Sequence, residues 1–237
     1  MAVTPTTWSP TDRHPTLSLS NSDLTASVAP FSGYFNARSV AGRDFGKLYW
    51  EVTIASMTGG SAVVGVGVMN ASESLGGSAE LYVGNSSEGI CYYSNTGTVY
   101  RGGGVVGTGT TANLTVGDVI GVALDFDTST VRFYKNGVLA WIVSGLPAGL
   151  LYPAISLFGP ASATANFGAS AFAYTPPSGF EAGFGSGQFL ISGTVTGSTG
   201  SPAARAIRAI REDTGAYVGG TISNATTGAY TISTPYS

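Results

Sequence analysis

The chain has 237 residues, of which ten are Lys or Arg and thirteen are Asp or Glu, so its formal net charge is −3. Charged residues make up only 10% of the sequence, well below the about 25% of typical globular proteins. The basic residues are scattered, which argues against nucleic-acid binding through a charged surface. A single cysteine, Cys91, excludes an intrachain disulfide and a zinc site built from several thiolates.

The sequence shows no segment for export or membrane insertion. No apolar run reaches the roughly 18–20 residues of a membrane-spanning helix, and residues 146–158 are interrupted by Pro147 and Pro153. The first eight residues lack the basic and apolar regions of a signal peptide. We expect folding in a reducing cytoplasm, which does not exclude later release within a particle.

The first half of the chain predicts β-strands. Residues 47–55 (KLYWEVTIA) alternate, so Trp50 and its apolar neighbours at every second position share one face. Residues 61–69 are apolar throughout, which is typical of a strand covered on both faces. Gly65 and Gly67 in this run leave room for close packing by a neighbouring strand.

The strand pattern continues along the chain. The Asn136-Gly137 dipeptide predicts a tight hairpin turn, because both central positions of a type I′ turn need positive φ. The further predicted strands are residues 119–126, 131–135, 138–143, 151–157 and 163–167. Many short strands at this spacing predict an all-β sandwich.

A domain boundary is predicted at residues 182–188, where the Gly-rich sequence AGFGSGQ is typical of a flexible linker. We therefore predict one domain over residues 1–181 and a second, smaller β domain over residues 189–237. In the second domain, residues 203–212 are predicted as a strand, although part of this run could also form two helical turns. The predicted strands of this domain stop without a final edge strand. We therefore predict that the domain is truncated or is completed by another chain.

The residue types needed for catalysis or metal binding are sparse. His14 is the only histidine and lies in a predicted surface turn, so no Ser–His–Asp set is indicated. Asp125 and Asp127 could offer oxygens to Ca²⁺, but this turn is too short for a full ligand set. No carboxylate pair stands out for glycoside hydrolysis. We expect no enzymatic activity, no cofactor and no metal.

Ordered sequence blocks between Trp8 and about Phe180 resemble the SPRY (B30.2-like) family. The blocks are TWSP (7–10), LSLSN (17–21), LT (24–25), GKLYWEV (46–52), VVGVG (63–67), GDVIGVALD (117–125), VRFYKNG (131–137), LYPAIS (151–156) and ANFG (165–168). The resemblance implies a bent sandwich of two antiparallel sheets. It also implies a binding module without catalytic activity, whose loops form a shallow surface for a peptide or protein.

The resemblance further implies which segments contact a partner. Carried over by position, the contact residues are Val28, Pro30, Ser32, Leu157, Phe158 and Gly159. An exposed Phe158 would be an apolar anchor, but Leu157 and Phe158 could equally be core residues at a strand end. The first segment lacks the Arg of peptide-binding members and has Val28 near that place, which argues against recognition of an acidic or Asn-rich peptide.

Aromatic side chains are a second source of contact area. Tyr92 and Tyr93 are adjacent, so strand alternation sends one inward and the other outward, and we include Tyr93 among the partner-binding residues. The aromatic candidates are Tyr34, Phe35, Tyr82, Tyr92, Tyr93, Tyr100 and Phe158.

From Phe189 onward the chain resembles carboxypeptidase-regulatory-like, immunoglobulin-like β domains, through ISGTVT (191–196), DTG (213–215) and TGAYTI (227–232). The combination resembles tail or fibre proteins of tailed bacteriophages. It implies a non-enzymatic virion protein, assembled in the host cytoplasm, that attaches to other virion proteins or to a protein or glycan receptor on the host. A homo-oligomer is left open. The alternative is a cellular adaptor that binds a peptide of a partner protein.

Overall fold

The computed structural model describes residues 3–30, 32–197, 200–210 and 217–235. The chain divides into two compact units, Thr4–Gly185 and a smaller unit formed by Ser186–Ser237 with Met1–Val3. Within the described part of the chain, all regular elements are strands, so the predicted all-β class is confirmed. None of the described residues belongs to a helix long and apolar enough to cross a membrane.

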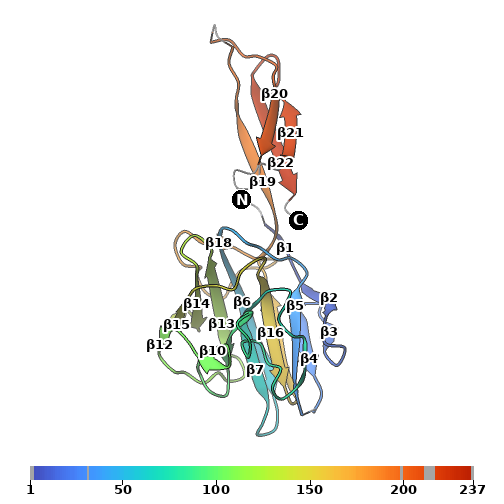
Figure 1. The fold of residues 1–237 in the computed structure, drawn as a ribbon, viewed down its shortest axis with the longest axis vertical. Coiled ribbons are helices and arrows are strands. Elements are labelled where there is room, and N and C mark those ends of the chain that lie inside the picture. Colours follow the sequence, from blue (N-terminus) through green and yellow to red (C-terminus); the bar gives the residue numbers. More distant parts are fainter. Residues whose placement is uncertain (1–2, 31, 198–199, 211–216, 236–237) are drawn as a thin grey trace. The chain divides into compact units, whose positions relative to one another are not determined.

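The larger unit is a sandwich of two sheets whose strands, apart from β18, pair antiparallel (Figure 1). One sheet has the order β11-β10-β9-β7-β16-β5-β2, with β8 paired to β5. Its strands are β2 (Trp8–Arg13), β5 (Tyr34–Ser39), β7 (Val63–Met69), β8 (Gly76–Ser78), β9 (Gly89–Tyr93), β10 (Val99–Arg101), β11 (Gly104–Val105) and β16 (Tyr152–Phe158).

The second sheet has the order β12-β15-β14-β13-β6-β17-β4-β3, and β18 pairs with β6. Its strands are β3 (Ser18–Ser20), β4 (Thr25–Val28), β6 (Lys47–Met57), β12 (Thr108–Gly109), β13 (Val119–Asp125), β14 (Thr130–Lys135), β15 (Val138–Ser144), β17 (Ala161–Asn166) and β18 (Glu181–Ala182). At the turn between β14 and β15, Asn136 has φ 50° and Gly137 has φ 78°. The predicted tight hairpin is thereby confirmed.

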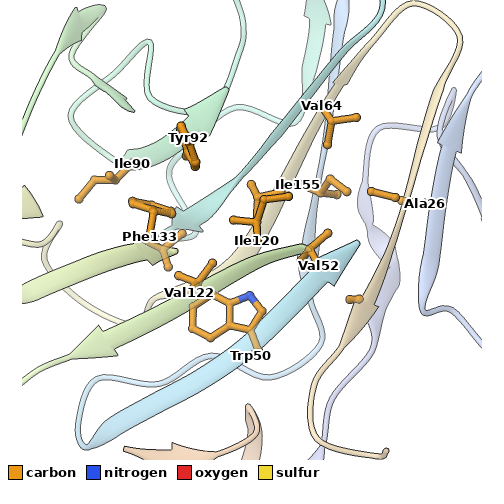
Figure 2. Packing of buried hydrophobic residues seen from close by; sticks show 14 of the residues in the cluster. Ala26, Trp50, Val52, Val64, Ile90, Tyr92, Ile120, Val122, Phe133 and Ile155 are labelled. Carbon is orange, nitrogen blue, oxygen red and sulfur yellow. The ribbon is translucent and has the colours of Figure 1, made fainter. Parts of the chain in front are cut away.

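The core lies between the two sheets (Figure 2). Trp50, on β6, is fully buried, as are the other apolar residues predicted to share its face. In Figure 2 the side chains of Trp50 and Val122 from one sheet lie across from Ile155 of the other. The predicted alternation of β6 is therefore correct, because it places every second residue in this core.

The segment predicted as a flexible linker is partly packed into the larger unit. Gly183 N donates a hydrogen bond to Tyr49 O at 2.8 Å, and Phe184 N donates to Phe167 O at 3.0 Å. Phe184 is fully buried and packs edge-to-face on Trp50, with ring centroids 5.1 Å apart. Burial of this aromatic ring fixes residues 182–184 despite the surrounding glycines, so the linker prediction is wrong for these residues.

The remaining strands form a three-stranded sheet in the order β1-β19-β22 and a two-stranded sheet of β20 and β21. These strands are β1 (Val3–Pro5), β19 (Gly185–Thr194), β20 (Ala206–Ile210), β21 (Tyr217–Ile222) and β22 (Ala229–Pro235). Residues 206–210 form a strand, as predicted in preference to a helix. The DTG turn predicted at residues 213–215 lies outside the described residues. The immunoglobulin-like assignment stays a prediction.

Candidate functional site

The first predicted contact segment contains both buried and exposed residues. Val28 is the last residue of β4 and pairs with Ala161 of β17, and its side chain lies in the core. The prediction that Val28 contacts a partner is therefore wrong, because strand alternation turns this side chain inward with Ala26. Pro30 and Ser32 are exposed beyond the strand, and neither lines the two hollows described below.

The second predicted contact segment, residues 157–159, also contains residues of different burial. Leu157 is fully buried among the core residues, so its predicted contact role is wrong. Phe158 follows on the opposite face of β16 and is half-buried. Gly159 is buried and adopts φ 66°, a conformation that favours glycine and turns the chain after the strand. Phe158 is thus the side chain of this segment that a partner can reach.

Tyr92 and Tyr93 do point to opposite faces of β9, yet both are buried. Tyr92 faces the core, where its ring centroid lies 5.9 Å from that of Phe133. Tyr93 faces away from the core, but other aromatic side chains cover it, and only 2% of it is exposed. The expectation that one residue of this pair is exposed is therefore wrong, because aromatic side chains cover the outer face of β9 as well.

The cover over Tyr93 consists of three further tyrosines and Phe158. We call Tyr34, Tyr82, Tyr93 and Tyr100 the tyrosine cluster. Tyr34 comes from β5, Tyr82 from the loop before β9, and Tyr100 from β10. Tyr82 and Tyr93 meet edge-to-face with centroids 5.8 Å apart, and Tyr34 lies 5.0 Å from Phe158. Such aromatic pairs stabilise by about 0.5–1.5 kcal/mol beyond their buried area.

Two small features of the sequence hold this cluster in place. A Cβ atom on Gly65 would lie 2.4 Å from Cε1 of Tyr93, so only glycine lets the ring cross the neighbouring strand. Asn36, fully buried on β5, donates through Nδ2 to Ser74 O at 2.8 Å and to Leu81 O at 2.9 Å. These bonds fix the loop that carries Tyr82.

Two adjoining hollows open beside these rings. The first, of about 260 Å³, is lined by Tyr34, Gly60, Ser61, Ala62, Val63, Asn95 and Phe158. The second, of about 180 Å³, is lined by Tyr34, Tyr82, Tyr93, Asn95, Thr96 and Tyr100. None of these described lining residues carries a charge. Each hollow is smaller than the about 300–1,000 Å³ of typical small-molecule pockets, so each suits a single side chain of a partner.

Asn95 lies between the hollows, and sequence reasoning missed it. The backbone around it is held firmly, because Ser94 Oγ accepts from Val64 N at 3.0 Å and Trp141 Nε1 donates to Gly97 O at 3.1 Å. Asn95 itself is exposed, and its amide has no hydrogen-bond partner among the described residues. A polar turn between two buried strands is the signal that would have indicated it.

Burial and mutual proximity keep the phenols of this site neutral. Desolvation, together with Cys91, Tyr82 and Tyr100, raises the pKa of Tyr34 to about 12. Desolvation also raises the pKa of Tyr82, with further contributions from Tyr100 and Glu80. The site therefore disfavours negative charge.

These pKa shifts predict the alkaline behaviour of the protein. Because the pKa of Tyr34 is higher in the folded state than its ordinary value of 10.0, its contribution to stability is complete below pH 10 and is lost between about pH 10 and 12. Absorbance of tyrosinate near 295 nm should therefore rise late in a pH titration, together with unfolding. Tyr34→Phe should remove one late-titrating phenol, and an unchanged titration curve would contradict the assignment.

The groups considered for catalysis or metal binding have local structural roles. Lys47 Nζ lies 3.2 Å from Asp125 Oδ2 and 3.6 Å from Asp127 Oδ2, so these carboxylates form an ion pair with lysine. The ring of His14 packs 4.7 Å from that of Phe35. The described residues contain no group of three or more His, Cys, Asp or Glu side chains that could hold a metal.

The two sheets define an antiparallel β-sandwich with an uncharged aromatic surface, and comparison with known proteins agrees with this fold. A family model described as SPRY domain matches residues 47–170, and the chain belongs to this family. The resemblance stated from the sequence blocks is thereby confirmed for the SPRY domain. No curated protein is significantly similar in sequence.

Several solved structures share the fold. The crystal structure of the SPRY domain of human HERC1 is 20% identical with a TM-score of 0.57, and the match covers 67% of this chain and 96% of that chain. The TRIM65 PSpry domain is 16% identical with a TM-score of 0.54, covering 68% and 92%. Stonustoxin is 19% identical with a TM-score of 0.50, covering 68% of this chain and 27% of that chain.

Proposed function

We propose that the chain binds a segment of a partner protein at the aromatic surface formed by the tyrosine cluster and Phe158. Membership of the SPRY family implies a protein-binding role. The observation that carries the location is the pair of side-chain-sized hollows that meet at Tyr34, one of them bordered by the half-buried Phe158. Binding here is surface complementarity, in which a few aromatic side chains supply most of the affinity.

Phe158→Ala is expected to weaken partner binding by at least about 2 kcal/mol, roughly 30-fold, as for a central aromatic anchor. Because Phe158 is half-buried and packs on Tyr34, the free energy of unfolding should fall by only about 1–2 kcal/mol, which leaves the variant folded. Peptides selected from a random display library on the full chain provide the ligands, and calorimetry measures their affinity.

The matched control is Val138→Ala, since Val138 is 71% exposed and lies outside both hollows. Val138→Ala should leave peptide affinity unchanged. If the selected peptides bind the Phe158→Ala variant as tightly as the original protein, the proposed surface is wrong.

For the biological setting, we propose that the protein is a structural component of a bacteriophage virion, in a tail, fibre or other surface appendage. Its partners would be other virion proteins or a receptor on the host surface. The low charge of the sequence and its 35 glycines support this proposal, because small, uncharged side chains suit closely packed particle surfaces. Mass spectrometry of purified particles tests it, and absence of the chain together with failure to bind host cells would contradict it.

A cellular adaptor is the second candidate. It is favoured by the fold likeness to the SPRY domains of human HERC1 and of TRIM65. Here the aromatic surface would bind a peptide of a cellular protein. The neighbouring genes separate the two candidates, because tail and capsid genes favour the virion and signalling genes favour the adaptor.

A further inference from the structure

The second hollow has an unusual lining, in which four of six residues are tyrosines. Neighbouring rings meet at steep angles: 89° between Tyr82 and Tyr93, 82° between Tyr82 and Tyr100, and 72° between Tyr93 and Tyr100. Their centroids are 5.8, 6.1 and 5.9 Å apart. The rings therefore form angled walls beside a space of about 180 Å³.

The charges around this hollow favour a cation. Glu80 is exposed next to Tyr82 and is close enough to act electrostatically on its phenol. Arg101 follows Tyr100 in sequence, but its guanidinium is directed away, since Nε donates to Ser87 O at 2.9 Å and Nη1 donates to Gly145 O. No basic side chain lines the hollow among the described residues.

We propose that the second hollow is a cation–π site that receives one Lys or Arg side chain of the partner protein, while the first hollow takes an apolar side chain beside Phe158. Tyrosine faces attract a cation within about 6 Å of the ring, with about 0.5–1 kcal/mol at exposed sites and about 2 kcal/mol or more when desolvated. This inference rests on the proposed function and specifies the chemistry of the partner.

Asn95 and Thr96 complete the hollow with neutral polar groups. Asn95, held between the two hollows, can pair with a peptide group of the partner through both its amide oxygen and its amide nitrogen. The neutral, half-buried phenols of Tyr34 and Tyr82, whose pKa values are raised by desolvation, make an acidic side chain unfavourable in the same place.

The test uses the full chain and two probes that differ only by the terminal ammonium group, N-acetyl-lysine methylamide and N-acetyl-norleucine methylamide. Tyrosine ring signals in NMR spectra report binding. The lysine probe should bind at least about fivefold more tightly than the norleucine probe and should shift the Tyr82 and Tyr100 signals. Equal affinity of the two probes, or no shift of these ring signals with either, would overturn the cation site.

Variants separate the ring from its hydroxyl group and from the nearby carboxylate. Tyr82→Leu should weaken lysine binding at least about fivefold, and Tyr82→Phe, which keeps the ring, should weaken it much less. Equal losses in both would assign the effect to the hydroxyl and overturn the proposal. Glu80→Gln, at an exposed position that does not threaten folding, should weaken lysine binding at low salt and have less effect as salt rises.

The selected peptides distinguish this inference from the proposed function. They should carry a Lys or Arg whose replacement by norleucine lowers affinity at least about fivefold. If affinity depends on Phe158 but not on that cation, the cation site is wrong while the proposed function stands. If affinity does not depend on Phe158, the proposed function is wrong, whatever the lysine probe shows.

Discussion

Trp50→Ala is expected to lower the free energy of unfolding of the larger unit by about 3–5 kcal/mol, the cost typical of removing a large buried aromatic side chain. Trp50 is fully buried in the middle of β6, where it pairs with Val122 of β13 and packs on Phe184. Its Nε1 atom has no hydrogen-bond partner among the described residues. The loss is therefore one of packing, with no hydrogen bond removed.

Urea denaturation followed by far-ultraviolet circular dichroism measures this effect. Trp50→Phe is the matched control, because it keeps an aromatic ring and removes the unpaired indole nitrogen, and it should lose clearly less than Trp50→Ala. A loss below about 1 kcal/mol for Trp50→Ala would mean that this residue is not part of the core.

Gly67→Ala is expected to destabilise the protein by more than about 3 kcal/mol, at or above the upper end of the usual range for overpacking. An added Cβ would lie 1.9 Å from Ile90 O and 2.8 Å from Cys91 Cα, both of them backbone atoms of β9. A side chain could rotate away, but backbone in a paired strand cannot, so β7 and β9 would have to separate. Tyr93, the member of the tyrosine cluster that lies on β9, would move with that strand.

Thermal unfolding and the near-ultraviolet circular dichroism of the tyrosines report both effects. Gly104→Ala is the control, because its added Cβ would come no closer than 4.0 Å to Arg101 O, the nearest atom. The two variants make the same chemical change at crowded and open positions. Similar melting temperatures for both would contradict the close packing of β7 against β9.

The strands and the core could be predicted because they follow a local rule. Alternation along β6 places Trp50 inward whatever its neighbours are, and the Asn136-Gly137 turn depends on two adjacent residues. The linker prediction failed because composition alone does not show that one aromatic residue, Phe184, finds a place in a distant core.

The site could be predicted only in part, because it depends on which loops cover the outer face of a sheet. The sequence shows that Tyr92 and Tyr93 point to opposite faces, but not that residues 74–82, fixed by Asn36, lie over the outer one. Aromatic residue types identified most of the cluster in advance. Asn95 belongs to the site only through the fold, which brings its turn beside Tyr34 and Phe158.

Cys91, the single cysteine of the chain, lies fully buried beneath the tyrosine cluster, and this burial raises the pKa of its thiol. The native protein should therefore resist alkylating reagents, because the thiolate is the reactive form. A second cysteine placed at exposed Val138 would be the only thiol open to a maleimide dye. Fluorescent or surface-immobilised protein can thus be prepared with one defined attachment point, without first removing the natural cysteine.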